Sequence, residues 1–494
     1  MSIDQPTRRV IALAPMPPEK SAYALARYSR SSDSIEGSLH WVHGHSSEKF
    51  WDQFYFDYGH ASIADLGHVI ICFEDISELA AIRLEDEPLW DGQAKSSRYQ
   101  NFASGGWYVP DSIRGSETEG TYHGILRSLA EIYRLLHQPL TQFISEREPR
   151  PESMKPADYQ RTIAARAFDV TRYLLPLAAK TNVGQVVSLR TLEKQITRLL
   201  SSQLPELRSI GDELKDACQR SPVNVWGELS GQTGAQEPLA PTLARHAKAN
   251  DYQASVYLDL ARYAKDALQG TGLDQPATWG AQEPVELIEP HDPLDEIVTT
   301  LLYRVSHAPY RSILAVVRNW TEKQKQEMID VAMSARGPYD ELIKEFRSGY
   351  AFTFDVLMDI GGWRDMHRHR RCQQIQQNFT TMHGYEVPPP LVQAGLDHEY
   401  RQAMDAVRSD IEQLKKTSAE GSLYATPFGF KVRCLFKMDY AEAEYIAKLR
   451  SGVKGHWSYR TIAWLMKQKI AARYPALGDR IQATSPDIED TLTR

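Results

Sequence analysis

The sequence predicts a mixed α+β protein built from two similar halves. Short apolar stretches typical of strands alternate with longer stretches whose apolar residues recur at helical spacing. A strand, a proline turn and an amphipathic helix are expected in RVIALAPMPPEKSAYALARYSRS, residues 9–31, and again in VELIEPHDPLDEIVTTLLYRVS, which starts at Val285. The 494 residues, 42% hydrophobic and 24% charged, have the composition of a globular protein that buries a sizeable core.

A longer internal match supports a tandem duplication. The segment YLLPLAAKTNVGQVVSLRTLEKQITRL, which starts at Tyr173, aligns without a gap on YATPFGFKVRCLFKMDYAEAEYIAKLR, which starts at Tyr424. When a chain contains an internal repeat, its domains are better divided by the repeat than by total length. We therefore predict a first repeat over residues 1–225, a linker over 226–284 and a second repeat over 285–494.

The predicted linker is rich in Gly, Gln, Pro and Ala, which is typical of connecting segments. Within it, DYQASVYLDLARYAKDALQ keeps mostly helical spacing of Val256, Leu258, Leu260, Ala264 and Leu268. We expect one docked helix in the linker. A second insertion, near FISEREPRPESMKPADYQ, belongs to the first half alone.

Charge, hydropathy and cysteine usage narrow the class of protein. The formal net charge of -7 disfavours binding to nucleic acid or an anionic membrane except through a local basic patch. Apolar stretches such as residues 69–73 are far shorter than the roughly 18 to 20 residues that cross a bilayer. The four cysteines lie far apart without a CxxC pair, which favours a reducing, cytoplasmic location.

The densest cationic cluster lies in WRDMHRHRRCQQIQQNF, where Arg364, Arg368, Arg370 and Arg371 surround two histidines. Arginine donors suit phosphate oxygens, and a histidine among arginines tends to stay neutral. We interpret the segment as an anion site. Alternatives are a solvated basic face or RNA-binding strip, and a metal site in which arginines would adjoin the ion, made by His367, His369, Cys372 and His383.

In the first half, YGHASIADLGHVIICFEDISELAAIRLEDEPLWDGQAKSSRYQNF contains two polar sets. Gly59 and His60 could cap a helix that runs on from Ala61, with Ser62 at the end where amide donors favour anions. Farther on, Ser96, Arg98 and Tyr99 offer a hydroxyl, a guanidinium and a ring suited to a nucleotide. An ordinary surface loop is the alternative for this triplet.

These residues resemble a known family. GHASIADLGHVIICFEDIS with SSRY in the first half, and AFTFDVLMDIGGWRDMHRHRRCQQ in the second, look like divergent copies of the flavin-dependent thymidylate synthase domain. That family's signature is GHxSxxEH, an FTF strand and then RHRxxSxNExSxR. The second half keeps the FTF strand (residues 352–354) and the triplet at 368–370, whereas the first half keeps the terminal SxR as Ser96 and Arg98.

Each half also departs from the signature. Where the family has Ser, Asn, Glu, Ser and Arg, the second half has Gln373, Ile375, Gln376, Asn378 and Thr380. In the first half the RHR positions hold Asp86, Glu87 and Pro88. Two later family arginines correspond to Arg190 and Arg208 in the first half, but to Ala441 and Tyr459 in the second.

The resemblance therefore implies a composite site. Flavin contacts fall to His60, Ser62, Arg368, His369 and Arg370, and pyrimidine nucleotide contacts fall to Ser96, Arg98, Arg190 and Arg208. At the reacting centre the resemblance implies Arg368 and Gln376. Neither half is complete alone, so two chains would imitate the family's homotetramer as a pseudo-symmetric homodimer.

The activity implied by the resemblance is reductive methylation at C5 of dUMP. Methylenetetrahydrofolate would be the carbon source, reduced FAD the hydride source and NADPH a co-substrate, and no protein nucleophile is needed. The loss of Glu and Ser after RHR leaves two alternatives open. One is a related flavoenzyme that modifies another pyrimidine nucleotide, and the other is a catalytically silent nucleotide- or RNA-binding protein.

Overall fold

The computed structural model describes residues 11, 13, 15–31, 34–57, 61–98, 102, 106–229, 231, 237–273, 282–288, 293–337, 340, 343–346, 352–479, 481–490 and 492. The chain divides into two compact units. Unit 1 comprises Met1–Ile71, Gln185–Leu200 and Arg208–Ala249, and unit 2 comprises Cys72–Gly184, Ser201–Leu207 and Asn250–Arg494. Of the strand expected at the start of residues 9–31, positions 9, 10, 12 and 14 lie outside the described residues, and Ile11 and Leu13 are not in a strand.

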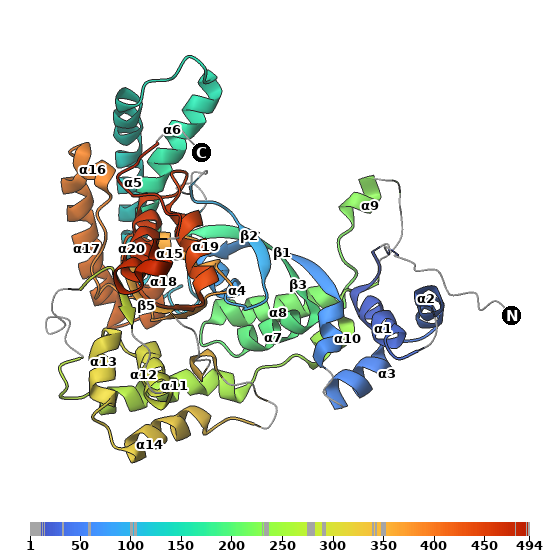
Figure 1. Ribbon diagram of the computed structural model, residues 1–494. Helices are drawn as coiled ribbons and strands as arrows, with labels where there is room; N and C mark the ends of the chain where they lie inside the picture. The colour runs from blue at the N-terminus through green and yellow to red at the C-terminus, as the bar shows by residue number, and fades with distance from the viewer. Residues whose placement is uncertain are drawn as a thin grey trace. The chain divides into compact units, whose positions relative to one another are not determined.

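The described part of unit 1 is helical, except for one end of each of two strands, residues 68–71 and 185–188. Its described elements are α1 (Pro18–Tyr28), α2 (Ile35–His43), α3 (Glu48–Phe50), the π-helix η1 (Trp51–Asp57), the 3-10 helix η2 (Ala61–Leu66), α7 (Leu189–Leu200), α9 (Val225–Leu229) and α10 (Pro241–His246) (Figure 1). Within it, the buried carboxylate of Glu19 accepts hydrogen bonds from the N–H groups of Thr242 (2.8 Å) and Leu243 (3.0 Å). These bonds satisfy amide donors that the helix start cannot satisfy internally.

The helix expected from Ala61 is the short 3-10 helix η2. It ends at Leu66, and the next residue must be a glycine, because a Cβ at Gly67 would lie 2.6 Å from the Pro18 carbonyl oxygen and 2.7 Å from Leu189 Cδ1. The chain then continues at once as strand β1 (His68–Ser77). Gly59 and His60 lie outside the described residues.

Two sheets are present. A three-stranded sheet has the order β1, β3 (Lys180–Ser188), β2 (Asp91–Ala94), and α8 (Pro205–Gln219), like β1 and β3, has residues in both units. Unit 2 holds a four-stranded sheet, antiparallel throughout, in the order β4 (Val285–Ile288), β5 (Phe352–Asp359), β7 (Lys431–Met438), β6 (Gln373–Gln376). The predicted FTF strand is therefore the first part of the inner strand β5. Most of its side chains are buried, as expected for a strand covered on both faces.

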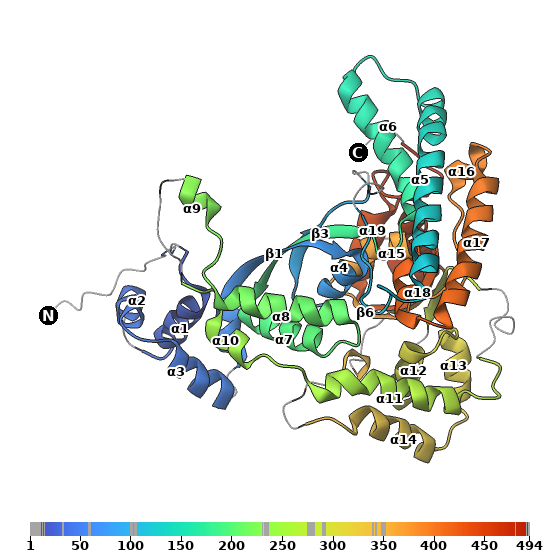
Figure 2. The ribbon, with the colours of Figure 1, turned by 180° about the vertical axis from the view of Figure 1, so that it is seen from behind.

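Helices α20 (Trp457–Arg473), α15 (Ile360–His367) and α12 (Pro293–Val305) contact this sheet. Figures 1 and 2 show α5 (Glu119–Arg147) beside α6 (Pro156–Thr171) and α17 (Asp397–Lys415). The remaining elements are α4 (Glu78–Leu84), η3 (Arg172–Leu174), α11 (Asp251–Ala267), α13 (Tyr310–Val317), α14 (Glu322–Met333), η5 (Lys344–Phe346), α16 (Pro389–Gln393), α18 (Ala419–Ala425), α19 (Tyr440–Ser451) and α21 (Pro475–Gly478).

The linker prediction can be compared with α11. This helix coincides with the predicted linker helix, and Val256, Leu260, Ala264 and Leu268 are buried, whereas Leu258 is 46% exposed. The same linker region also contains α10 and most of α9, which the spacing did not predict. Both are short, and short helices give too few apolar repeats to be recognised from spacing.

Hydrogen bonds in unit 2 reveal a local twofold arrangement of the two repeats. Phe428 N–H donates to the Leu175 carbonyl (2.9 Å), and Leu177 N–H donates to the Thr426 carbonyl (3.0 Å). The two donors are 251 residues apart, and so are the two acceptors. Pro176 and Pro427 face each other at the centre of this pairing. The ungapped alignment is thus realised as a self-complementary contact, as in a twofold dimer.

The symmetry continues outward from this centre. Glu78 N–H donates to the Ala179 carbonyl (2.8 Å), and its counterpart Ile360 N–H donates to the Phe430 carbonyl (2.9 Å). In each repeat a tyrosine hydroxyl also donates to a backbone carbonyl fourteen residues earlier, at 2.7 Å for Tyr122 and 2.9 Å for Tyr400. The predicted mixed fold with two tandem copies is confirmed. Among the described residues, no helix combines the length and apolar character needed to cross a membrane.

Candidate active site

Helix α15 carries the arginine-rich segment of the second repeat. The helix is capped by Asp359, whose carboxylate accepts a hydrogen bond from Gly362 N–H (2.5 Å), and it ends at His367. Arg364 and Arg368 therefore lie at its carboxyl end, where the negative end of the helix dipole favours cations. The sequence thus concentrates positive charge at one end of one short helix.

Asp365, on the same helix, joins the two repeats. Its Oδ1 lies 2.5 Å from Nη2 of Arg368, and its Oδ2 lies 3.3 Å from Nη1 of Arg172 in the first repeat. Burial alone would raise the pKa of the Asp365 carboxyl. The guanidinium groups around it outweigh this effect and hold the pKa of Asp365 well below its usual range. They are those of Arg172, Arg368, Arg98 and Arg450.

Arg98 makes a second connection between the repeats. Its Nε donates to Oδ1 of Asp169 (2.6 Å) and its Nη2 to Oδ2 (3.1 Å), a two-pronged pair. Its Nη1 donates to the hydroxyl of Tyr459 in the second repeat (2.9 Å). The hydroxyl of Ser96 accepts a hydrogen bond from the Arg98 N–H (3.3 Å) and so shapes the loop that carries the guanidinium.

His369 is buried, with both ring nitrogens engaged. Arg450 Nε donates to its Nε2 (2.7 Å), so the ring proton is on Nδ1, which donates to Glu442 Oε1 (3.2 Å). Burial lowers the pKa of His369, and the neighbouring guanidinium groups add to this effect. A lowered pKa agrees with the neutral histidine that the sequence predicts among these arginines. A ring that is 5% exposed and bonded at both nitrogens positions Arg450 and has no nitrogen left for a ligand.

Arg370 is the more accessible arginine of the triplet. Its Nη1 lies 2.9 Å from Asp91 Oδ1, and both side chains are exposed, at 37% and 80%. Its guanidinium also lies 5.9 Å from the centre of the buried Trp90 ring. An exposed ion pair contributes little energy, so Arg370 can exchange this partner for another anion at low cost.

Arg364 pairs with the first repeat through a buried carboxylate. Its Nη2 lies 2.5 Å from Oε2 of Glu78, whose side chain is fully buried. Burial raises the pKa of Glu78 to about 7 even with Arg364 beside it. Burial therefore opposes ionisation of this carboxyl group, although Arg364 lies beside it.

Three comparisons relate this chain to known proteins. The family model described as "Thymidylate synthase complementing protein" matches residues 11–221 and again residues 296–476. The chain belongs to this family, the flavin-dependent thymidylate synthases. The two separate matches coincide with the two repeats that the hydrogen bonds relate.

Relatives include UPF0159 proteins of Chlamydia pneumoniae, 24% identical over 86% of this chain and 78% of the relative, and of Thermoplasma acidophilum, 23% identical over 93% and 94%. Among solved structures, the flavin-dependent thymidylate synthase ThyX of Helicobacter pylori complexed with FAD and dUMP is 16% identical. The match covers 41% of this chain and 89% of the Helicobacter pylori chain, with a TM-score of 0.26.

The arginines of the cluster belong to one of two positions related by the local twofold. In the second repeat, Arg364 and Arg368 correspond by sequence to Ile82 and Asp86 of the first. In the first repeat, Arg98 and Arg172 correspond by sequence to Thr380 and Leu423 of the second. One of two equivalent positions is therefore rich in guanidinium groups, and the other has lost them.

The position that lost its arginines is occupied by other charged pairs of unit 2. Asp86 lies 3.3 Å from Lys344 of η5. Arg304 of α12 lies 3.7 Å from the buried Glu345, which also accepts a hydrogen bond from the hydroxyl of Tyr257 in the linker helix (3.2 Å). Side chains of the linker and of the second repeat thus fill the surroundings of Asp86.

Gln376 lies apart from the arginine cluster in its contacts. It is buried in β6, its side-chain amide donates to the Gln377 carbonyl (2.7 Å), and its own carbonyl accepts from Arg304 Nη1 (3.1 Å). Through Asp365 and Arg450, the structure therefore brings together Arg98, Arg368 and His369 of the predicted residues, with Ser96 beside Arg98. Arg370 contacts Asp91 and Trp90 instead, and Gln376 is not part of the cluster.

Three of the predicted site residues belong to unit 1, and their surroundings are given within that unit. Arg190 in α7 lies 3.2 Å from Asp65, Arg208 in α8 is exposed, and Ser62 in η2 is exposed. His60 lies outside the described residues. Among the described residues no group of three or more His, Cys, Asp or Glu could hold a metal ion, so the metal alternative gains no support.

Sequence reasoning missed Arg172, Arg450, Asp169 and Asp365 as members of the cluster. Asp365 was inside the quoted arginine-rich segment, beside its partner Arg368, but its partner Arg172 is 193 residues away in the chain. A buried role for Arg172 had one available signal, its position directly before the matched Tyr173 segment. No local pattern marks Arg450 or Asp169.

Proposed function

We propose that this chain is an FAD-dependent enzyme that methylates C5 of dUMP, with methylenetetrahydrofolate as carbon source and NADPH as the source of electrons for the flavin. Membership of the family supports the reaction class. The proposal depends on one observation: Asp365 contacts both Arg172 of the first repeat and Arg368 of the second. A site that needs both repeats is what the duplication predicts.

The residues at the end of α15 fit the phosphate part of FAD. Arg368 and Arg370 are 35% and 37% exposed, and their donors match the oxygens of a pyrophosphate. His369 does not contact the cofactor in this proposal, because Glu442 and Arg450 occupy its ring nitrogens. Bound reduced flavin would supply the hydride for the reaction.

The chain's own residues would bind and orient the substrates and would exclude water from them. Cys372 is unsuited to act as a nucleophile, because burial raises the pKa of its thiol well above the usual value. Arg98 would hold the nucleotide phosphate. Because Arg98 is already paired with Asp169, a phosphate would have to share or replace that carboxylate.

Replacing Arg98 with alanine should weaken dUMP binding by about 1.5 to 3 kcal/mol, the scale of a hydrogen bond to a charged group. Asp169→Asn should act in the opposite direction and tighten binding, because it removes the anion that competes with the phosphate. Calorimetric titration of both variants with dUMP measures the two effects. Equal dissociation constants in the parent chain and the Arg98 variant would remove Arg98 from the site.

A related flavoenzyme for another pyrimidine nucleotide is the second candidate. The residues Gln373 and Gln376, which stand where the family has Ser and Glu, donate to the Lys344 and Gln377 carbonyls. A carboxylate expected at the reacting centre is thus replaced by a neutral side chain engaged elsewhere. Growth of a thymidine-requiring strain that carries this chain separates the two candidates, and a colourless purified protein would favour a silent binding protein over both.

The proposal includes a homodimer in a reducing cytoplasm. A dimer of this chain would contain four family repeats and so imitate a homotetramer. All four cysteines are free, as in proteins of reducing compartments. Sedimentation of the purified chain tests the dimer, and a monomeric mass at micromolar concentration would exclude it.

A further inference from the structure

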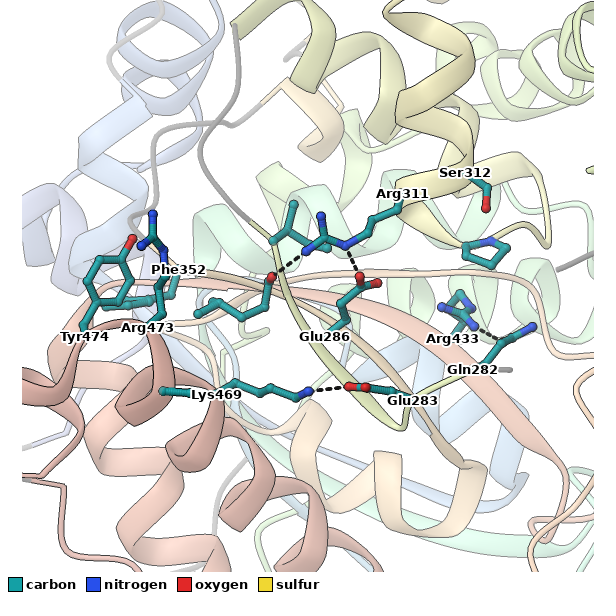
Figure 3. A pocket seen from close by; sticks show the side chains of 14 residues that line it. Gln282, Glu283, Glu286, Arg311, Ser312, Phe352, Arg433, Lys469, Arg473 and Tyr474 are labelled. Atoms are coloured by element: carbon teal, nitrogen blue, oxygen red, sulfur yellow. Dashed lines mark hydrogen bonds and ion pairs between the residues drawn. The ribbon is translucent and has the colours of Figure 1, made fainter. Parts of the chain in front are cut away.

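A polar cavity lies in unit 2 away from the arginine cluster. It has a volume of about 580 Å³, within the range of small-molecule sites. Its walls come from β4, from the start of α13, from Arg433 in β7 and from the carboxyl end of α20 (Figure 3). Because β4 and β6 are opposite edges of the sheet, this cavity lies at the edge opposite the strand that follows the RHR triplet.

The cavity has an excess of positive charge. Arg311, Arg433, Lys469 and Arg473 line it, whereas its lining carboxylates are those of Glu283 and Glu286. Figure 3 shows Lys469 paired with Glu283, and Arg311 paired with Glu286. Even when the buried Asp355 behind Arg433 is counted, the cations outnumber the carboxylates. The local charge therefore favours an anion over a cation or a neutral ligand.

The α13 end of the cavity has donors suited to phosphate. Helix α13 begins after Pro309, which supplies no side-chain cap, and Arg311 and Ser312 of its first turn line the cavity. At the helix start, Tyr310 N–H already donates to Asp355 Oδ2 (3.0 Å) and Ser312 N–H donates to the Pro309 carbonyl (3.1 Å). The donors offered to a phosphate are therefore the side chains of Arg311, Ser312 and Arg433. Arg433 is 3% exposed, and its Nε has no hydrogen-bond partner among the described residues. A buried donor without an acceptor is costly, and a bound anion would relieve this cost.

The opposite side of the cavity has an aromatic surface. Tyr474 is 36% exposed and meets the edge of Phe352, with ring centres 6.0 Å apart. The Arg473 guanidinium lies 5.6 Å from the Tyr474 ring centre. A planar ring can stack against such a surface. Figure 3 shows this aromatic side across the cavity from Ser312 and Arg433.

We propose that this cavity binds a nucleoside monophosphate, with the phosphate at the side chains of Arg311, Ser312 and Arg433 and the base at Tyr474. The combination of a cationic side and an aromatic side, separated across one cavity, matches a ligand that has a phosphate at one end and a planar ring at the other. The site is independent of the proposed flavin and dUMP site, with which it shares no residue.

The test is calorimetric titration of the full chain with AMP and, separately, with inorganic phosphate. AMP should bind more tightly than phosphate. Arg311→Gln should weaken AMP binding about tenfold, the effect of losing one charged hydrogen bond. Glu286→Gln should tighten it, because it frees Arg311 from a carboxylate, and a misfolded variant would not bind more tightly.

Two further variants separate the two ends of the ligand. Tyr474→Ala should weaken AMP binding while leaving phosphate binding unchanged. Arg401→Gln, which removes an exposed arginine of α17 outside the cavity, should leave both unchanged. Circular dichroism of each variant checks the fold. AMP binding that ignores the Arg311, Glu286 and Tyr474 variants, no binding at millimolar AMP, or equal affinity for AMP and phosphate would each overturn the proposal.

Discussion

Asp365→Asn should destabilise the folded chain by about 3 to 5 kcal/mol, the cost of removing one partner from a buried ion pair. The carboxylate is contacted by Arg172 and Arg368, and Arg98 and Arg450 also interact with it, so the variant leaves several buried guanidinium groups without their shared anion. Urea unfolding at neutral pH measures the loss. Because the pKa of Asp365 is lowered in the folded state, its contribution is present above about pH 4 and fades only as the solution becomes strongly acidic.

The matched control is Asp405→Asn. Asp405 is an aspartate of α17 that pairs with Arg408, and its side chain is 53% exposed. Exposed pairs contribute little, so this variant should change the free energy of unfolding by no more than about 0.5 kcal/mol. Similar losses in the two variants would show that Asp365 does not hold the arginine cluster together.

Arg370→Ala should release flavin while leaving the fold intact. The expected loss of affinity is about 1.5 to 3 kcal/mol, or roughly 10- to 150-fold, because the side chain would donate charged hydrogen bonds to the cofactor phosphates. Its present partner Asp91 is 80% exposed, so the folded state loses little when the pair is removed. Absorbance of bound flavin after gel filtration measures the release.

Arg371→Ala is the control for this variant. Arg371 is the neighbouring residue, is 74% exposed and lies 3.8 Å from Asp439, a long and exposed pair. It should keep its flavin. Full flavin occupancy in the Arg370 variant, or equal loss in both variants, would contradict the assignment of the RHR segment to the cofactor.

Local patterns predicted much of the fold. The FTF strand, the linker helix and the Tyr173 and Tyr424 segments could be recognised because strands, helices and repeats each leave a regular signal along the chain. The reciprocal hydrogen bonds around Pro176 and Pro427 then showed what the repeat means in space. The repeat alone could not show that the two copies pair with each other.

The site was predicted less completely. Arg98 and Arg368 came from sequence, but the buried acids that organise them, Asp169 and Asp365, did not. Ion pairs between residues far apart in the chain depend on tertiary structure and leave no periodic pattern. The same limit applies to Gln376, where the family signature indicated a catalytic position and the structure shows an amide bonded to a neighbouring carbonyl.

The most direct test of the account is the number of flavins bound per chain. One position of the twofold keeps Arg98, Arg172, Arg364 and Arg368, and its counterpart has Thr380, Leu423, Ile82 and Asp86. Flavin absorbance against protein concentration, after saturation with FAD and removal of the excess, should give one FAD per chain. Two flavins per chain would contradict the single composite site, and none would contradict the proposed cofactor.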